Sequence, residues 1–218
     1  MRFRDRTDAG RQLVGVLGDM KLSRCPIVLA LPRGGVPVAF EVTLAFDRPL
    51  EVFVARKIGA PGHSEFGIGA MAEGGSVVVD QQAVQALGLS GEEFERLVDV
   101  ERRELDRRVQ RYRGDRQLPD MAGRDVIVVD DGLATGVTAE AALRALRGHS
   151  PHLLVLAVPV CAAETAERLR QVADEVVCIA EPTPFLAVGR FYDRFDQTSD
   201  EEVLDLLAQS LARAEAIP

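Results

Sequence analysis

The sequence has few cysteines and histidines, and neither type is spaced as metal ligands usually are. Its three cysteines, Cys25, Cys161 and Cys178, lie far apart in apolar surroundings, and no Cys-x-x-Cys motif occurs. The three histidines show no ligand spacing either. These absences argue against a zinc site and against a disulfide framework. We therefore expect three buried thiols in a reducing compartment, which indicates a cytoplasmic protein.

An excess of basic residues is also missing, since the formal net charge is −8 at pH 7. A general nucleic-acid binder needs a basic surface that releases counterions from phosphates. The acidic balance therefore argues against a nucleic-acid partner. It leaves room for a local basic patch that binds a small anionic molecule.

Long hydrophobic runs are absent as well. The N-terminal stretch "MRFRDRTDAG" has no apolar core of the kind that a signal peptide needs. The longest nearly apolar stretch, "LLVLAVPVCAA", contains a proline and is too short to cross a bilayer. We expect no membrane partner.

The hydrophobic residues that are present indicate an α/β fold. Short apolar runs without alternation predict strands buried on both faces, at residues 27–30, 52–55, 126–129, 153–158 and 175–179. Helical patterns alternate with them, at residues 8–20, 36–45, 137–148 and 162–173. This alternation predicts a parallel twisted sheet flanked by helices. With 218 residues, the chain is expected to form a single domain, residues 1–218, with a core at about 8–180.

Three segments depart from this alternation. Residues 56–79 are rich in glycine and predict a mobile loop followed by a hairpin. Residues 91–113 predict a charged surface helix with one apolar stripe, formed by Phe94, Val98, Leu105, Val109 and Tyr112. The tail, residues 181–218, gathers aromatic residues before a final helix. Those aromatics are compatible with a lid over a ligand and equally with a small separate hydrophobic cluster.

One stretch combines features that usually belong to different ligands. In "VIVVDDGLATGVTA", residues 126–139, Asp130 and Asp131 end a strand, and a loop of small residues then opens a helix. Unpaired N–H groups at a helix N-terminus bind phosphate, which would repel two carboxylates. Asp131 or Thr138 could instead cap the helix, which explains one residue but not the whole string. A sugar phosphate resolves the conflict, because its phosphate and its hydroxyls can reach the loop and the carboxylates separately.

The order of this stretch resembles the 5-phosphoribosyl-1-pyrophosphate (PRPP) motif of type I phosphoribosyltransferases. Four apolar residues precede two acids, three small or apolar residues and Thr-Gly-x-Thr. The resemblance implies that Asp130 and Asp131 are catalytic residues at the ribose hydroxyls. It also implies a 5′-phosphate loop formed by Ala134, Thr135, Gly136, Val137 and Thr138.

A second stretch, "LALPRGGVPVA" at residues 29–39, resembles the pyrophosphate loop of the same family. In that family one peptide of this loop is commonly cis, and the bond joining Pro32 to Arg33 is the candidate here. The resemblance assigns pyrophosphate binding to Arg33, Gly34 and Gly35. Arg56 and Lys57 form a basic pair at the end of the strand predicted at 52–55, which favours the same role over the alternative of simple surface solvation. The resemblance also makes residues 56–79 the flexible loop that closes over the reacting centre.

The resemblance further implies a reaction and its participants. Members transfer the phosphoribosyl group of PRPP to a nitrogenous base and release pyrophosphate, with Mg²⁺ carried by the substrate near Asp130 and Asp131 and no direct protein ligand. The tail corresponds to the hood, where Phe185, Phe191 and Tyr192 are the candidates for stacking on the acceptor. Members of the family commonly form homodimers. Some members bind PRPP or a nucleotide only as non-catalytic regulators, which is the alternative function.

The sequence departs from the family pattern at two positions of the phosphate loop. Ala134 stands where enzymes for 6-oxopurines carry an acid, which disfavours hypoxanthine or guanine and is closer to the adenine-type loop. Val137 replaces a glycine, and because a β-branched residue disfavours positive φ, we expect Val137 to be helical already. A phosphohydrolase or receiver-like domain would explain the two aspartates but neither glycine-containing loop. Glu65 and Glu73 flank the loop expected to be mobile and are candidates for acid–base or Mg²⁺ roles, although solvated surface is the favoured explanation for each.

Overall fold

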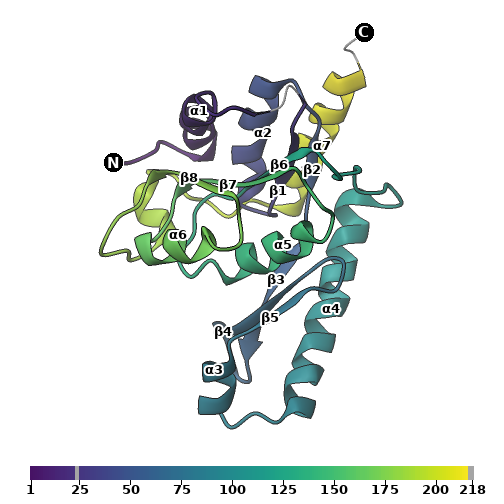
Figure 1. Ribbon diagram of the computed structural model, residues 1–218, viewed down its shortest axis with the longest axis vertical. Helices are drawn as coiled ribbons and strands as arrows, with labels where there is room; N and C mark the ends of the chain where they lie inside the picture. The colour runs from purple at the N-terminus through teal and green to yellow at the C-terminus, as the bar shows by residue number, and fades with distance from the viewer. Residues whose placement is uncertain (23–24, 216–218) are drawn as a thin grey trace.

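A five-stranded parallel sheet forms the centre of the protein in a computed structural model, which describes residues 1–22 and 25–215, the side chains of residues 64 and 65 excepted (Figure 1). Its strand order is β2-β1-β6-β7-β8. The bounds are Ile27–Ala30 for β1, Leu50–Val52 for β2, Asp125–Val129 for β6, Leu153–Val160 for β7 and Glu175–Ala180 for β8. The predicted parallel α/β sheet is therefore confirmed.

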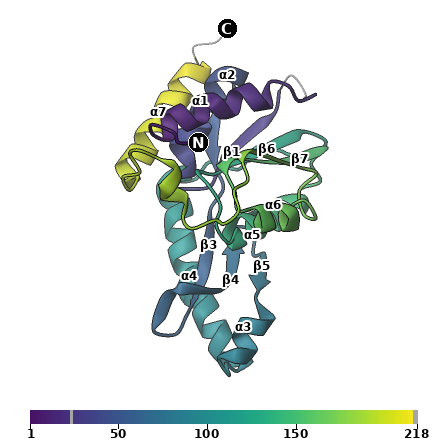
Figure 2. The ribbon, with the colours of Figure 1, turned by 90° about the vertical axis from the view of Figure 1, so that its left-hand side faces the viewer.

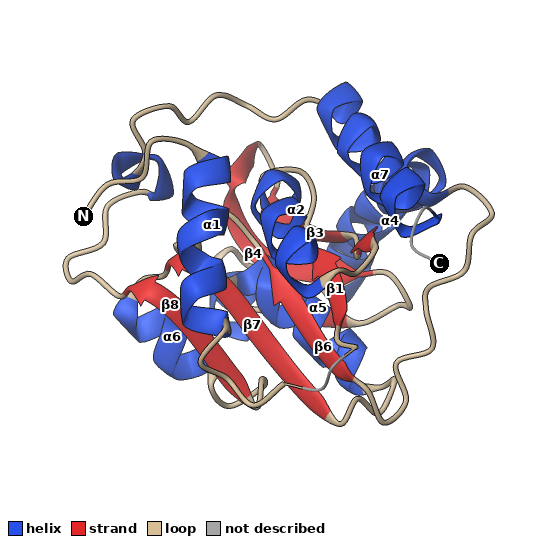
Figure 3. Cartoon of the chain, turned by 90° about the horizontal axis from the view of Figure 1, so that it is seen from above, coloured by secondary structure: helices blue, strands red, loops and turns tan. Residues whose placement is uncertain are grey.

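Helices cover both faces of this sheet, as Figure 3 shows from above. Helices α1 (Arg6–Leu17) and α2 (Gly35–Phe46) lie on one face, while α5 (Val137–Arg147) and α6 (Ala163–Leu169) lie on the other. The C-terminal helix α7 (Asp200–Glu215) packs against α2 and β2. Alternate strand residues serve the two cores, so that Val28 faces the first core and Leu29 faces the second.

A second, antiparallel sheet projects from the central one (Figures 1 and 2). It contains β3 (Ala55–Ala60), β4 (His63–Ala72) and β5 (Val77–Val79), in that order. Helix α3 (Gln81–Ala86) follows, and the long helix α4 (Gly91–Arg113) runs back along this arm. The prediction of a loop followed by a hairpin was wrong in its first half, because residues 55–60 pair with β4 as a strand, with register shifts around Gly59.

Helix α4 has the bounds and the apolar stripe that the sequence predicts. Phe94, Val98, Leu105 and Tyr112 are buried, and Val109 is partly buried against the same core. A capping box fixes its start, since Ser90 and Glu93 bond each other's backbone N–H groups. The last turn of this helix lies beside the carboxyl end of β2, where Arg113 donates to the carbonyl of Val52 at 3.3 Å.

The tail returns along the edge of the molecule to meet the N-terminus. Its short 3₁₀ helix η1 (Val188–Phe191) is followed by Tyr192, which pairs with Phe3 as an isolated bridge. Phe3, Ala9 and Tyr192 form a small buried cluster of their own. Of the two explanations for the tail aromatics, the separate cluster therefore applies to Tyr192.

The cysteine prediction is confirmed only in part. Cys161 is buried and Cys178 is half-buried, but Cys25 is exposed because it precedes β1 in the loop rather than lying within the strand. In the described part of the chain, no helix is both long enough and apolar enough to cross a membrane.

Candidate active site

Asp130 and Asp131 directly follow β6, at the edge of the sheet where the strands end. The loop after the neighbouring strand β1 packs against them. A Cβ atom on Gly34 would lie 2.1 Å from a carboxylate oxygen of Asp131, and one on Gly35 would lie 2.5 Å from the carbonyl oxygen of Val129. Only glycine permits this approach. The two predicted loops thus form one continuous site.

The loop that carries Gly34 and Gly35 has the predicted backbone. The peptide joining Pro32 to Arg33 is cis, as the resemblance implied. The N–H of Leu31 donates to the carbonyl of Val129 at 2.9 Å, which ties the loop to the end of β6. Helix α2 begins at Gly35, so that its N-terminus lies at the same edge of the sheet.

The predicted 5′-phosphate loop also has the expected conformation. Gly136 has φ 64°, in the left-handed region, and α5 begins at Val137, as its β-branched side chain predicted. The carbonyls of Ala134 and Gly136 accept hydrogen bonds from the hydroxyl of Thr165 at 2.6 Å and the N–H of Glu140 at 2.9 Å. Arg168 donates to the carbonyl of Thr135.

With their carbonyls engaged, the residues of this loop present their N–H groups outward. Within the described part of the chain, the N–H groups of residues 135–138 have no acceptor. An array of this kind at a helix N-terminus binds phosphate without any charged side chain. A cavity of about 870 Å³ borders Thr135 and Thr138 and is large enough for a sugar phosphate.

Arg56 and Lys57 do not act together as the sequence predicted. Both lie inside β3, where successive side chains point to opposite faces. Lys57 lines the cavity beside the 5′-phosphate loop. Arg56 turns to α4, where its Nε donates to Glu101 at 2.6 Å. The prediction of a basic pair at a strand end missed this division, because it took both residues to follow a strand.

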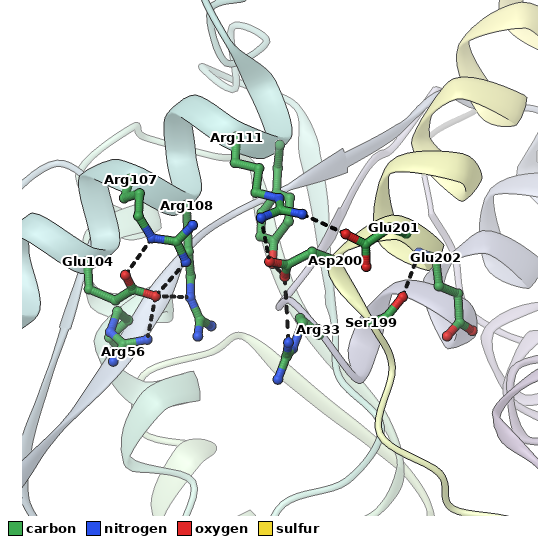
Figure 4. Close-up of polar contacts among 11 residues, drawn as sticks. Arg33, Arg56, Glu104, Arg107, Arg108, Arg111, Ser199, Asp200, Glu201 and Glu202 are labelled. Atoms are coloured by element: carbon green, nitrogen blue, oxygen red, sulfur yellow. Dashed lines mark hydrogen bonds and ion pairs between the residues drawn. The ribbon is translucent and has the colours of Figure 1, made fainter.

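Arg33 lies on the side of the site that faces α4 and α7. Its guanidinium is 3.6 Å from a carboxylate oxygen of Asp200, too far for a hydrogen bond (Figure 4). Asp200 also contacts Arg111 at 3.2 Å and accepts a hydrogen bond from the hydroxyl of Tyr112. The arginine assigned to pyrophosphate by the sequence is thus grouped with residues of α4 that the sequence analysis treated as surface.

Arg6 is a site residue that the sequence analysis missed. Its Nε donates to a carboxylate oxygen of Asp131 at 2.8 Å, with both side chains largely buried. The guanidinium also lies 4.0 Å from the ring centre of Phe195 and donates to the carbonyl of Asp196 at 2.6 Å. Because 125 residues separate Arg6 from Asp131, no local pattern could indicate the pair.

The three hood aromatics have different positions. Tyr192 is 2% exposed, with its ring packed between those of Phe3 at 5.4 Å and Phe195 at 4.8 Å. Its hydroxyl donates to the carbonyl of Asp131 at 2.6 Å. Tyr192 therefore supports the aspartate and has no free ring face for an acceptor. Phe185 and Phe191 stack on each other at 5.6 Å and are half-buried.

Burial raises the pKa of both aspartates. The pKa of Asp130 lies well above its ordinary value of 3.8, first because burial disfavours its charge and then because Asp131 lies beside it. Burial also raises the pKa of Asp131, but Arg6 opposes this. Asp131 is therefore the member of the pair that ionises first, and Asp130 holds its proton to a higher pH.

Replacing Asp130 with asparagine should stabilise the fold, increasingly at higher pH. An acid with a raised pKa in the folded state binds a proton where the unfolded chain has released it. Its contribution to stability therefore falls as pH rises from about 3.8 through the folded pKa. We expect Asp130→Asn to raise the Tm by about 3 °C at pH 8 and by little near pH 4. Thermal unfolding across this range measures it, and an equal gain at both ends would contradict it.

Few carboxylates are placed to bind a metal directly. The described residues contain no group of three or more His, Cys, Asp or Glu side chains suited to a metal ion. Glu73, a candidate from the sequence, is used in a buried ion pair with Arg113 and accepts a hydrogen bond from the N–H of Val54 at 2.9 Å. The side chain of Glu65 lies outside the described residues. Asp130 and Asp131 are the carboxylates next to both loops.

A parallel sheet covered by helices on both faces, with an open helix N-terminus and an acidic pair at its carboxyl edge, defines an α/β protein whose candidate site lies where such sheets bind ligands. Comparison with known proteins is more specific. Residues 21–193 match the phosphoribosyl transferase domain family, and the chain belongs to that family.

Two relatives illustrate the similarity. The protein TT1426 from Thermus thermophilus has a crystal structure that aligns with a TM-score of 0.80 at 43% identity, covering 96% of this chain and 99% of that one. The protein Rv0571c of Mycobacterium tuberculosis, whose name assigns it provisionally to the phosphoribosyl transferases, is 43% identical over 99% of this chain. The chain spans about half the length of this relative, 49%.

Proposed function

We propose that the protein is an enzyme that transfers the 5-phosphoribosyl group of PRPP to a nitrogenous base and releases pyrophosphate. One observation carries the proposal. The outward N–H groups of residues 135–138 lie a few residues from Asp130 and Asp131, which Gly34 and Gly35 contact from the second loop. A 5′-phosphate, a ribose diol and a diphosphate are the three groups that this arrangement suits.

Each part of the site has a role in the proposed reaction. The bond from ribose C1 to the diphosphate oxygen breaks, a bond from C1 to the acceptor nitrogen forms, and the acceptor gives up a proton. Positive charge develops on the ribose ring and negative charge on the departing diphosphate. Ionised Asp131 accepts hydrogen bonds from the ribose hydroxyls and favours the positive ring. Arg33 and the N-terminus of α2 favour the diphosphate.

Mg²⁺ belongs to this proposal as a substrate-borne ion. It binds oxygen ligands and keeps several waters, so two nearby carboxylates and a diphosphate are a sufficient set. Asp130 and Asp131 are the residues that would hold it, through its water ligands. Its chemical contribution is to neutralise the leaving diphosphate.

The acceptor is proposed to be a planar nitrogenous base other than a 6-oxopurine. Ala134, at the position where those enzymes carry an acid, is exposed and offers no proton acceptor in its side chain. Phe185 and Phe191 are half-buried on the hood side and supply aromatic surface. Tyr192 is excluded from the stacking role because its ring is enclosed.

Asp131→Asn should lower the rate of pyrophosphate release by about 100-fold or more, because the amide cannot replace the negative charge that favours the transition state. The assay contains PRPP, Mg²⁺ and a panel of bases, and measures pyrophosphate. The wild type should show turnover with at least one base, and its Tm should rise with PRPP.

The same assay separates the enzyme from a PRPP-sensing regulator. A regulator would show a Tm rise and saturable PRPP binding, with no pyrophosphate released for any base. That result would overturn catalysis while keeping the ligand. Absence of both binding and turnover at millimolar PRPP would overturn the proposal as a whole.

A further inference from the structure

The arginines of α4 are of two kinds. Arg102 and Arg107 pair with acids of their own helix and have side chains 47% and 51% exposed, as expected for a solvated helix face. Arg108 has a side chain only 21% exposed, and its charge acts on Asp200 at the start of α7. On a helix that only forms a charged surface, arginine side chains are expected to be exposed to solvent, so the low exposure of Arg108 indicates another role.

Arg108 connects two groups of residues beside the site. Its Nε donates to Glu104 at 2.9 Å, and Arg56 lies 3.7 Å from the same carboxylate oxygen. It also lies close enough to Asp200 to help lower the pKa of that carboxyl, after the Tyr112 hydroxyl, Arg111 and Arg33. Arg108 therefore lies between Arg56 on β3 and Arg33 on the loop after β1.

The ends of these side chains share a direction. In Figure 4 the guanidinium groups of Arg33 and Arg108 both point away from the ribbon of α4, toward the same side. Glu104 accepts a hydrogen bond from Arg108, and Asp200 lies 3.6 Å from Arg33. Within the described residues, Arg33 donates no hydrogen bond and Arg108 donates one, through Nε. Their terminal N–H groups are available for a ligand.

Arginines and carboxylates alternate at this place. Four guanidinium groups, those of Arg33, Arg56, Arg108 and Arg111, lie among four carboxylates, those of Glu101, Glu104, Asp200 and Glu201. A cavity of about 270 Å³ adjoins Arg33 and Arg111 and is also lined by residues 197–201, with Asp200 and Glu201 among them. The forked donors of Arg33 and Arg108 that these carboxylates leave without a hydrogen bond suit a multivalent anion.

We propose that α4 supplies Arg108, with Arg111 beside it, to a diphosphate-binding subsite that begins at Arg33. This rests on the proposed function and deepens it, because Arg33 belongs to the loop that contacts Asp131 through Gly34. The helix of residues 91–113 then forms one wall of the substrate site. The competing explanation is that these arginines only fasten α4 to the start of α7.

The test is calorimetric titration of the full chain with two ligands, inorganic pyrophosphate with Mg²⁺ and ribose 5-phosphate. Arg108→Gln should weaken pyrophosphate binding about tenfold, the loss expected for charge-assisted hydrogen bonds to one guanidinium. Ribose 5-phosphate binding should stay within about twofold, because it depends on the 5′-phosphate loop. Arg108→Lys should restore part of the affinity, since lysine keeps the charge without the fork.

Arg107→Gln is the matched control, because it removes an arginine on the same helix that contacts the same Glu104 from its exposed side. It should leave both affinities unchanged. Arg111→Gln is a second variant should Arg108→Gln fold poorly, and it should weaken pyrophosphate selectively too.

Three results would overturn the subsite. They are unchanged pyrophosphate affinity in Arg108→Gln, equal weakening of both ligands, and no binding of pyrophosphate by the wild type. The proposed transfer reaction stands or falls separately. Turnover with a base alongside an unaffected Arg108→Gln rejects only the subsite, and selective weakening without turnover rejects only the enzyme.

Discussion

Gly136→Ala should weaken ribose 5-phosphate binding by about 100-fold while leaving the protein folded. Gly136 has φ 64°, which an alanine adopts only with strain. An added Cβ would lie 2.5 Å from a methyl carbon of Thr165 and 3.1 Å from Leu169. The loop must therefore move away from α6, and the N–H groups of residues 135–138 would no longer converge on one phosphate.

Calorimetric titration with ribose 5-phosphate measures this, with Gly15→Ala as the control. Gly15 lies inside α1, where nothing is within 4 Å of an added Cβ. That substitution should leave binding unchanged and stabilise the fold by about 0.5–1 kcal/mol, because alanine favours a helix interior. Binding by Gly136→Ala within threefold of the wild type would show that the phosphate binds elsewhere.

Features that depend on neighbouring residues were predictable from the sequence. The resemblance implied the cis peptide between Pro32 and Arg33, and the β-branched side chain of Val137 predicted the start of α5. The strand and helix alternation follows from hydrophobic period alone. The acid pair and the two glycine-containing loops meet because parallel strands deliver their carboxyl ends to one edge.

Features that depend on distant residues were not predictable. Arg6 reaches Asp131 across 125 positions, and nothing in the N-terminal stretch distinguishes it from the arginines around it. Arg56 and Lys57 point to opposite faces because they lie within β3, whereas the sequence analysis ended a strand at residue 55 and placed both in the loop after it. Side-chain type does not fix such a boundary. For α4, the sequence predicted only an apolar stripe. Such a stripe predicts which face of the helix is buried, but not which residues pack against that face.

The placement of α4 matters for function if it carries part of the diphosphate site. Its hydrophobic stripe fixes which face is buried, but many helices slide along such a stripe at little cost. A specific polar contact can fix the position along the helix axis. The last turn of α4 has such a contact in Arg113, which forms an ion pair with Glu73, the residue that directly follows β4.

Glu73→Ala should destabilise the protein by about 3–5 kcal/mol, the cost of leaving one partner of a buried ion pair unpaired. Both side chains of the pair are only 8% exposed. Glu73 also accepts from the N–H of Val54 at 2.9 Å, and Arg113 contacts the carbonyl of Val52 at 3.3 Å. At this chain length the loss corresponds to a fall in Tm of about 10 °C.

Thermal unfolding measures this loss, and two comparisons identify its origin. Arg102→Ala removes an exposed arginine of the same helix and should change the Tm by about 1 °C or less. The double variant Glu73→Leu with Arg113→Leu removes both charges and should recover much of the stability, because an apolar pair needs no partner in the interior. If the double variant recovers its stability but binds pyrophosphate more weakly, the ion pair sets the position of α4. Equal Tm values for Glu73→Ala and Arg102→Ala would show that the pair contributes nothing to stability.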